Sequence, residues 1–316
     1  MQATVVDSVL RILEKSGFEV TDLVETKPRC FEIIAKKAEN VLLVKVLYNI
    51  DSLKPEIAED MKSVSILLKA SPIVIGERFK FSYLDRGVVY NRYGLPVINT
   101  ATLYDLIVDK IPPVIYSAPG GYYVRLDSER IREVREELGI SLGVVAKELG
   151  ISRRAVKKYE EGVDTSVENA LKLEDILETN VVKAIDILRF VGKEVNEQRD
   201  IGLSDEEAEI VDQLRYLGIK VYPIRHAPFD VIFKPIDELV LTGIRQVKEI
   251  EKRAFVLDKV SSTLSTDAAY IVEKSIDRDI GSVIFLVKEE LDTISSSKDF
   301  VSLINEKKEE RTSPRE

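Results

Sequence analysis

The stretch SLGVVAKELGISRRAVKKYEEG, from Ser141 to Gly162, decides the architecture of this chain. Ser141 stands where a helix N-cap is expected, and apolar residues then recur at helical spacing for about eight residues. Gly150 follows where the chain must turn sharply, a place that suits a left-handed residue. Ser152 is the expected N-cap of a second helix over Arg153–Tyr159. The side chains expected to face inward are those of Val144, Val145, Ala146, Leu149 and Val156.

Two helices joined by a tight glycine turn at this spacing define a helix-turn-helix, and the outward side chains here are basic. Five cations lie between positions 147 and 158 with only Glu148 opposing them, in a chain whose net charge is −9. In this motif the early residues of the second helix face base edges in the major groove, and flanking cations neutralise phosphates. The alternative is that these are ordinary solvated charges on a surface helix.

The sequence therefore predicts a surface that binds double-stranded DNA. We expect Arg153, Arg154 and Lys157 to contact bases or nearby phosphates. We expect Ser152, Lys147 and Lys158 to contact the DNA backbone. Ser141 completes the set at the start of the first helix. A single such unit covers few base pairs, so a homodimer on a two-fold operator is expected.

The segment Ser128–Leu177 resembles the lambda-repressor/Cro-like helix-turn-helix family. The ending Tyr159-Glu160-Glu161-Gly162 matches the family's usual sequence after the recognition helix, and flanking helices are expected over Glu129–Leu138 and Val167–Leu177. One departure is Leu142, which stands where the family often carries a glutamine that supports the phosphate contact. The resemblance implies a compact domain of five helices that reads DNA sequence.

Nearly the whole chain resembles the archaeal group of helix-turn-helix transcriptional regulators. The stretches that carry this resemblance are SGFEVTDLVETKPRCFEIIAKK, VKVLYNIDSLKP, SPIVIGERF and PPVIYSAPGGYYV. It implies a sequence-specific transcriptional regulator that is not an enzyme, located in the cytoplasm.

Around the helical segment, helix and strand patterns alternate, so the predicted fold class is α/β plus all-α. The expected parts are an α/β domain (1–110), a hairpin or linker (111–127), the helical DNA-binding domain (128–191), a linker (192–204), a second α/β domain (205–304) and a disordered tail (305–316).

The second α/β domain is interpreted as a diverged repeat of the first. The alignment pairs Ile12–Val20 with Gln213–Val221, and Phe31–Val44 with Phe229–Thr242 after a three-residue shortening between the two blocks. It also pairs LPVIN…LYDLI with LDTIS…FVSLI at Leu291–Ile304.

Both α/β halves resemble the restriction-endonuclease-like fold, which leaves a divalent-metal-dependent nuclease as an alternative. Such nucleases need two carboxylates for the metal and a lysine near the reacting phosphate. Glu32 and Lys45 have plausible spacing, but Leu43 stands where the second carboxylate is required. The second copy keeps Asp230 and has Leu241 and Gly243 at the other two places. The resemblance therefore favours an inactive scaffold, and a protein-interaction adaptor is a further alternative.

The scarce residue types argue against other chemistry. Cys30 is the only cysteine and His226 the only histidine, which excludes a disulfide, a cysteine-built metal site and a paired-histidine zinc site. We expect no catalytic residues, no metal and no cofactor. No apolar run approaches the ~20 residues that span a bilayer, so no membrane contact is expected.

Residues 77–94, ERFKFSYLDRGVVYNRYG, mix three tyrosines with Arg78, Lys80, Arg86 and Arg92. Contact with a nucleic-acid backbone is one interpretation of this pattern. A strand–turn–strand with an alternating polar face is the other, and the sequence does not separate them.

Overall fold

The computed structural model describes residues 2–23, 29–190, 192, 195, 203–235, 238–244, 250–276 and 279–312. The chain divides into two compact units. The first contains residues 1–16, 46–53 and 73–189, and the second contains residues 17–45, 54–72 and 190–316. The predicted N-terminal domain, 1–110, is thus shared between the two units. Most of the predicted linker 192–204 lies outside the described residues.

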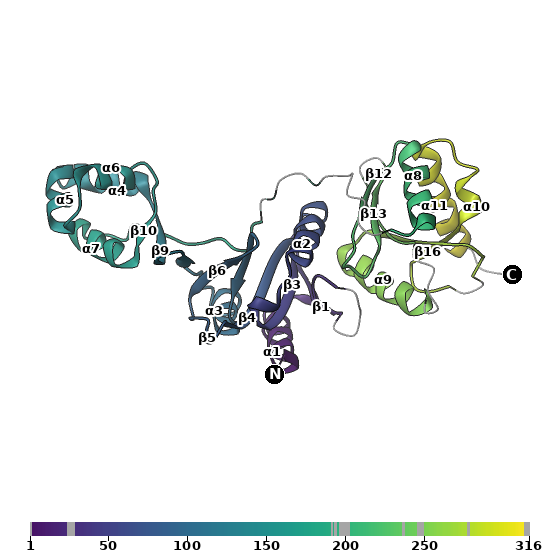
Figure 1. Cartoon of the computed structure of the whole chain (residues 1–316), viewed down its shortest axis with the longest axis horizontal. Helices are drawn as coiled ribbons and strands as arrows, with labels where there is room; N and C mark the ends of the chain where they lie inside the picture. The colour runs from purple at the N-terminus through teal and green to yellow at the C-terminus, as the bar shows by residue number, and fades with distance from the viewer. Residues whose placement is uncertain are drawn as a thin grey trace. The chain divides into compact units, whose positions relative to one another are not determined.

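The first unit holds a long sheet and two groups of helices (Figure 1). Its helices are α1 (Gln2–Lys15), the 3-10 helix η1 (Ile50–Ser52), α3 (Thr100–Ile107), α4 (Ser128–Glu137), α5 (Leu142–Leu149), α6 (Arg153–Tyr159) and α7 (Val167–Leu177). Its strands are β4 (Ser71–Phe79), β5 (Ser82–Tyr83), β6 (Val88–Arg92), β7 (Leu95–Ile98), β8 (Ile115–Ala118), β9 (Gly121–Leu126), β10 (Thr165–Ser166) and β11 (Val182–Lys183).

Strand pairing in the first unit joins the α/β part to the helical part. The strand order runs β4-β7-β6-β8-β9-β10, with β5 beside β4 and β11 beside β9. The segment 111–127 forms the expected hairpin, but β8 also pairs in parallel with β6 through Val88↔Ile115 and Val89↔Tyr116. It is therefore a pair of strands within the sheet as well as a connection.

A hydroxyl network adds to this pairing. Tyr122 on β9 donates to the carboxylate of Asp85, and its hydroxyl lies 3.3 Å from that of Tyr90 on β6. These hydrogen bonds raise the pKa of Tyr122, since they stabilise the protonated phenol. The connection between the two parts is thus held by side chains as well as by backbone.

The segment 128–191 contains four helices among its described residues, where five were expected. The difference lies in the two short strands: Thr165↔Val124 and Val182↔Leu126 pair with β9. These pairings bring β9 into the core of the helical domain, where Val124 and Leu126 pack with the buried side chains of α4–α7. The backbone groups of β10 and β11 are satisfied by a partner distant in sequence, which helical periodicity alone does not show.

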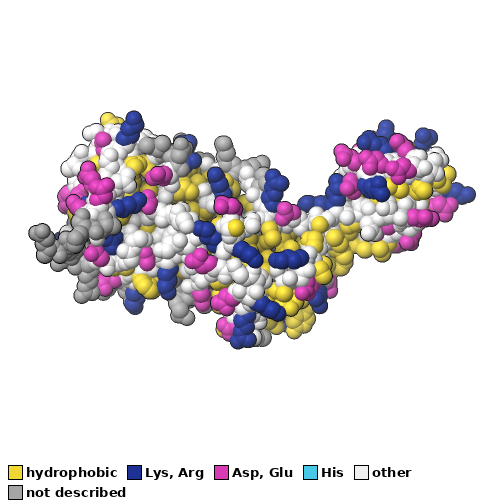
Figure 2. Space-filling view, turned by 180° about the vertical axis from the view of Figure 1, so that it is seen from behind, with side chains coloured by type: hydrophobic (Ala, Val, Ile, Leu, Met, Phe, Trp, Pro, Cys, Tyr) yellow, Lys and Arg dark blue, Asp and Glu magenta, His cyan; other side chains and the backbone are white. Residues whose placement is uncertain are grey.

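The second unit contains the remaining elements. Its helices are α2 (Pro55–Leu67), α8 (Asp205–Tyr216), α9 (Ile250–Leu264), α10 (Lys288–Leu291) and α11 (Ser297–Thr312). Its strands are β1 (Glu19–Asp22), β2 (Ile33–Lys37), β3 (Asn40–Asn49, which continues into the first unit), β12 (Lys220–Pro223), β13 (Val231–Lys234), β14 (Val240–Gly243), β15 (Asp267–Val272) and β16 (Ile284–Val287). Both units are heavily charged outside, and the face in Figure 2 shows Lys and Arg side chains among Asp and Glu side chains.

Helix α9 lies between two sheets in the second unit. It packs on β14 and β15 on one side and on β1 and β2 on the other. Thr21 and Thr263 share a hydroxyl hydrogen bond, and Lys36 Nζ donates to Ser265 Oγ at 2.8 Å. This packing explains why β1 and β2 belong to the second unit although α1 belongs to the first.

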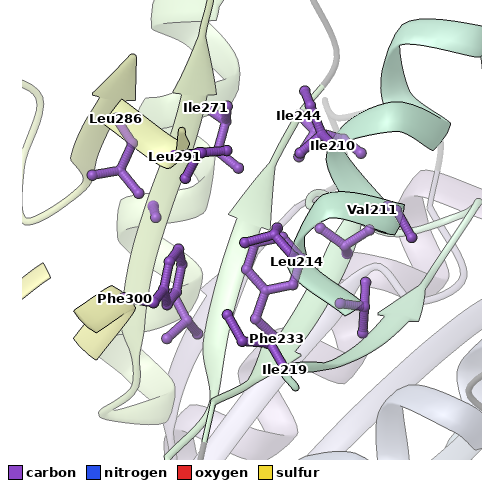
Figure 3. Close-up of a cluster of buried hydrophobic side chains, with 14 of the residues drawn as sticks. Ile210, Val211, Leu214, Ile219, Phe233, Ile244, Ile271, Leu286, Leu291 and Phe300 are labelled. Carbon is purple, nitrogen blue, oxygen red and sulfur yellow. The ribbon is translucent and has the colours of Figure 1, made fainter. Parts of the chain in front are cut away.

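The sheet β12-β13-β14-β15-β16 has a second covered face, where α8, α10 and α11 pack (Figure 3). Leu214 from α8, Phe233 from β13 and Phe300 from α11 meet there, and the two phenylalanine rings form an edge-to-face pair at 5.9 Å. Because strand residues alternate in direction, Ile232 and Leu241 point to the other face. A sheet covered on both faces accounts for the nearly continuous apolar runs in these strands.

The element order of the second α/β segment repeats that of the first. The order α1-β1-β2-β3-α2-β4 corresponds to α8-β12-β13-β14-α9-β15. The pairs Ile33↔Val44 and Ile34↔Leu43 correspond to Val231↔Thr242 and Ile232↔Leu241, the register that the sequence alignment implies. The third aligned block differs: it pairs strand β7 with a segment that begins at the end of α10. The duplication itself stays a prediction.

The structure also differs from the expected disordered tail at 305–316. Helix α11 continues to Thr312, and residues 313–316 lie outside the described part. Ion pairs hold the extension: Lys307 pairs with Glu290 at 2.6 Å, and Lys308 pairs with Asp267 at 2.8 Å. Arg311 donates to the carbonyl of Gly281 at 2.8 Å. A charged segment thus becomes helical because its cations meet specific acceptors. No described helix is long and apolar enough to cross a membrane.

Candidate nucleic-acid interface

The helix-turn-helix begins and ends where its capping residues predict. Ser141 Oγ accepts from the backbone N–H of Val144 at 3.3 Å, and Ser152 Oγ accepts from that of Ala155 at 3.2 Å. Gly150 has φ of 70°, a left-handed conformation that costs a glycine little. The predicted caps and turn are therefore confirmed, and the predicted helix Arg153–Tyr159 coincides with α6.

The buried face of the motif fixes which side chains point outward. Val145, Ala146 and Leu149 of α5 pack against Val156 and Tyr159 of α6 in one core. The expectation that Val144 also faces inward is wrong, because its side chain is 47% exposed. At about 100° per residue, Val144 is turned away from the face that Val145 and Leu149 share.

All seven predicted DNA-binding residues are exposed. Lys157 Nζ lies 3.9 Å from the Glu161 carboxylate in a solvent-exposed pair, and such a pair contributes little to stability. Within the described part of the chain, no acidic partner is found for Lys147, Arg153, Arg154 or Lys158. Figure 2 shows the helical part at the right, with Lys and Arg side chains at its outer edge. The structure thus brings the predicted cations together on α5 and α6 and leaves them available to an anionic ligand.

An ion pair that the sequence did not predict holds α6 in place. Arg135 of α4 donates two hydrogen bonds to Glu160, the C-cap of α6. Its Nε donates to Oε1, and its Nη2 donates to Oε2 at 3.3 Å. Arg135 Nη1 also donates to the carbonyl of Ile140 at 3.1 Å. The Arg135 and Glu160 side chains are 12% and 9% exposed, and the pair raises the pKa of Arg135. The only signal for it is the motif ending that contains Glu160.

The same ending supplies a second contact. Tyr159 is buried, and its hydroxyl accepts from Thr165 Oγ1 at 2.8 Å. Thr165 lies on β10, which pairs with β9, so the end of α6 is tied to the sheet. A helix of seven residues is too short to be stable alone, so α6 depends on these tertiary contacts for its stability.

The carboxylate of Glu32 is the other sequence-predicted candidate, and it lies in a closed charge cluster. Glu32 is 2% exposed, and its Oε1 receives both Lys45 Nζ at 2.8 Å and Arg29 Nε at 3.0 Å. Leu43 is fully buried at the position where a second carboxylate would stand. Asp60, a buried carboxylate on α2, accepts from the backbone and ring nitrogens of His226 at 2.9 and 2.8 Å.

This arrangement does not fit a divalent metal. One carboxylate oxygen shared by two cations is a poor ligand for Mg²⁺, which requires several oxygen donors. Among the described residues no group of three histidine, cysteine or acidic side chains is placed to hold a metal ion. The cluster is arranged as a buried ion pair, and no reaction step through a metal follows from it.

The second α/β segment also has a buried carboxylate, and the cation that pairs with it comes from a different element. Asp230 occupies the place of Glu32: its backbone N–H donates to Thr242 at 2.9 Å, as that of Glu32 donates to Val44 at 2.8 Å. The cation comes from Arg253 on α9, whose Nη2 lies 2.7 Å from Asp230 Oδ1. A Cβ at Gly243, the position of Lys45, would lie 2.4 Å from the ring of Tyr270. The aromatic ring therefore takes the space that the lysine uses in the first copy.

Comparisons with known proteins divide the chain in the same way. A family model described as a PD-(D/E)XK superfamily domain matches residues 2–113, and one described as a helix-turn-helix matches residues 131–183. Both agree with the expected mixed fold class. No solved structure matches the chain.

Full-length relatives carry the name "Putative HTH-type transcriptional regulatory protein". The one from Archaeoglobus fulgidus is 57% identical over 307 residues, covering 97% of this chain and 99% of the relative. The one from Haloarcula marismortui is 38% identical over 316 residues, covering 98% of each. The one from Methanococcoides burtonii is 36% identical over 310 residues, covering 96% of each.

Replacing Arg135 by Met is expected to destabilise the helical domain by about 2 kcal/mol, because Glu160 would remain largely buried without its partner. Hydrogen–deuterium exchange of the α4 and α6 amides would measure the loss directly. The control is Lys172→Met, which removes a lysine 2.7 Å from Glu168 in an exposed pair and should change exchange little. Equal exchange rates in both variants would contradict a stabilising role for the Arg135–Glu160 pair.

Proposed function

Because the chain belongs to the archaeal family of HTH-type transcriptional regulatory proteins, we propose that it binds double-stranded DNA sequence-specifically through α5 and α6. The single observation that supports this most is the set of exposed cations on the outward face of the motif, of which only Lys157 has an acidic neighbour among the described residues. In a chain of net charge −9, such a concentration is what phosphate binding requires. Binding to genomic DNA would place the protein in the cytoplasm.

The roles of the side chains follow from their positions on α6. Arg153 and Arg154 begin the helix, where a helix-turn-helix meets base edges, and Lys157 is one turn further along. Arginine can donate two parallel hydrogen bonds to guanine, so it supplies specificity as well as charge. Lys147 on α5 and Lys158 at the end of α6 would neutralise phosphates on either side.

Dimerisation is the second part of the proposal. One helix-turn-helix reads only a few base pairs, and two copies related by a two-fold axis double the contacts and match a palindromic operator. The α/β segments, which carry no metal site among their described residues, would serve as the dimer scaffold. An effector ligand forms no part of the proposal.

DNA cleavage is the alternative function that the match to a PD-(D/E)XK superfamily domain raises. We propose that the domain does not cleave, because Glu32 is neutralised by Lys45 and Arg29 and because Leu43 offers no ligand. The domain would then act as a scaffold.

The DNA-binding surface is tested by two substitutions with different expected results. Arg154→Ala should relax the preference at one base step by about 1–3 kcal/mol, because a base contact is lost. Lys158→Ala should weaken binding to all sequences alike. It should also reduce the slope of the logarithm of the binding constant against the logarithm of the salt concentration by about one, because one phosphate contact is lost. The operator is first selected from random DNA, and binding is then measured by fluorescence anisotropy over a salt series.

The matched control is Lys172→Ala, which removes a cation that is already paired on α7. If Arg154→Ala and Lys158→Ala bound like the wild type, the assignment of this face would be wrong. If the wild type bound no DNA even at about 50 mM salt, where phosphate contacts are strongest, the protein-interaction adaptor would be favoured instead.

The dimer is tested by analytical ultracentrifugation of the full chain. We expect a dimer at micromolar concentration, and one dimer per two-fold operator. A monomer both in the free state and on DNA would contradict the proposal.

Cleavage is tested by incubating plasmid and linear DNA with the full chain and Mg²⁺ or Mn²⁺. We expect no products, and we expect Glu32→Gln to leave the result unchanged. Cutting by the wild type that Glu32→Gln or Lys45→Met abolishes would establish a nuclease.

A further inference from the structure

Exposed aromatic rings and three basic side chains, of which Arg78 and Arg92 are half-buried, surround the turn between β4 and β5, and the helix-turn-helix does not use them. Phe81, at the tip of this turn, is 95% exposed, and Tyr83 on β5 is 64% exposed. Single exposed apolar side chains are ordinary, but neighbouring exposed aromatic rings mark binding surfaces more often than chance.

The turn itself is held firmly although its tip is exposed. Lys80 has a left-handed φ of 54°, and its backbone N–H donates to Asp51 Oδ2 at 2.7 Å. Arg78 Nη2 donates to the carbonyl of Phe81 at 3.3 Å, and Asn49 Nδ2 donates to that of Lys80 at 3.4 Å. Three side chains thus fix the backbone of the turn while the Phe81 ring stays in solvent. Because the backbone is already held, only the side-chain torsions of Phe81 remain to be ordered when the ring binds a partner.

A second turn joins the same surface. Asp51 also pairs with Arg92 at 3.6 Å, which brings the turn between β6 and β7 next to the first. Arg92 lies over the ring of the exposed Tyr93 at 4.7 Å. The aromatic–basic surface, defined as Arg78, Lys80, Phe81, Tyr83, Arg92 and Tyr93, therefore comes from two turns that share one carboxylate.

The charge and the ring geometry of the aromatic–basic surface together indicate the chemistry of its partner. The surface carries three cations against the carboxylates of Asp51 and Glu77, so a positive charge remains and an anionic partner is favoured. The guanidinium of Arg78 lies over the Tyr83 ring at 4.7 Å, and the hydroxyl of Tyr48 is hydrogen-bonded to Tyr83, which raises the pKa of Tyr48. Planar groups beside cations match a chain of flat bases joined by phosphates.

We infer that the aromatic–basic surface binds single-stranded nucleic acid, with bases stacked on Phe81 and Tyr83 and phosphates near Arg78, Lys80 and Arg92. A single strand fits better than a duplex. Its bases are already unpaired, whereas insertion of Phe81 into a duplex would require unstacking that only three cations offset. The surface is separate from α5 and α6, so the inference does not depend on the proposed operator binding.

Binding of the full chain to an oligothymidylate of about 16 nucleotides, measured by anisotropy at about 50 mM salt, tests the inference. We expect Phe81→Ala and Tyr83→Ala each to weaken binding by about 5- to 150-fold, the range for one stacked base. Tyr216→Ala, which removes an aromatic ring on α8 that is 91% exposed, should have no effect. Circular dichroism of the variants confirms that they are folded.

The variant Phe81→Trp gives a direct readout, since the chain has no other tryptophan. We expect it to bind as tightly as the wild type and its fluorescence to be quenched by the oligonucleotide. The double variant Arg153→Ala/Arg154→Ala should bind the oligonucleotide normally although it loses duplex binding.

Three results would overturn the inference. The first is failure of the wild type to bind the oligonucleotide. The second is unchanged binding by Phe81→Ala together with loss of binding by Arg153→Ala/Arg154→Ala. The third is that Phe81→Ala loses binding to vesicles of anionic phosphatidylglycerol and keeps binding to the oligonucleotide, which would identify the surface as a membrane contact.

Discussion

The proposed recognition surface depends on how a seven-residue helix is held. Helix α6 is too short to be stable in isolation, so its position comes from Val156 and Tyr159 in the core and from the Arg135–Glu160 pair at its end. Because one face of α6 is buried and its end is held by an ion pair, the cationic side chains of α6 point to solvent. The same contacts that stabilise the helix thus concentrate positive charge on one surface of an acidic protein.

Each of the two α/β segments has a buried carboxylate, and its negative charge is neutralised in a different way in each segment. Glu32 and Asp230 stand at equivalent places in equivalent hairpins, yet one is neutralised from its neighbouring strand and the other from helix α9. A buried carboxylate without a counter-charge is costly, so each copy needs a cation but not a particular one. Leu43 and Leu241 offer no metal ligand, so in both places the buried carboxylate is balanced by a cation of the protein.

Local signals in the sequence predicted most of the candidate site. The starts of α5, α6 and α7 follow from serine caps, and the end of α5 follows from a left-handed glycine, which are properties of a few adjacent residues. The direction of Val144, the strands β10 and β11, and the Arg135–Glu160 pair depend on partners far away in sequence. So does the assignment of β1 and β2 to the second unit, because α9 covers them. Periodicity reports which residues are buried in an element, and says little about what buries them.

The pairing of β8 with both β6 and β9 has a consequence for how this chain can vary. Val124 and Leu126 enter the helical core only because β9 keeps its register with β8. Adding or deleting one residue in the hairpin would turn these side chains to the opposite face. A segment whose prolines and glycines give it the composition of a spacer is therefore one where insertions and deletions should be rare among descendants of this gene.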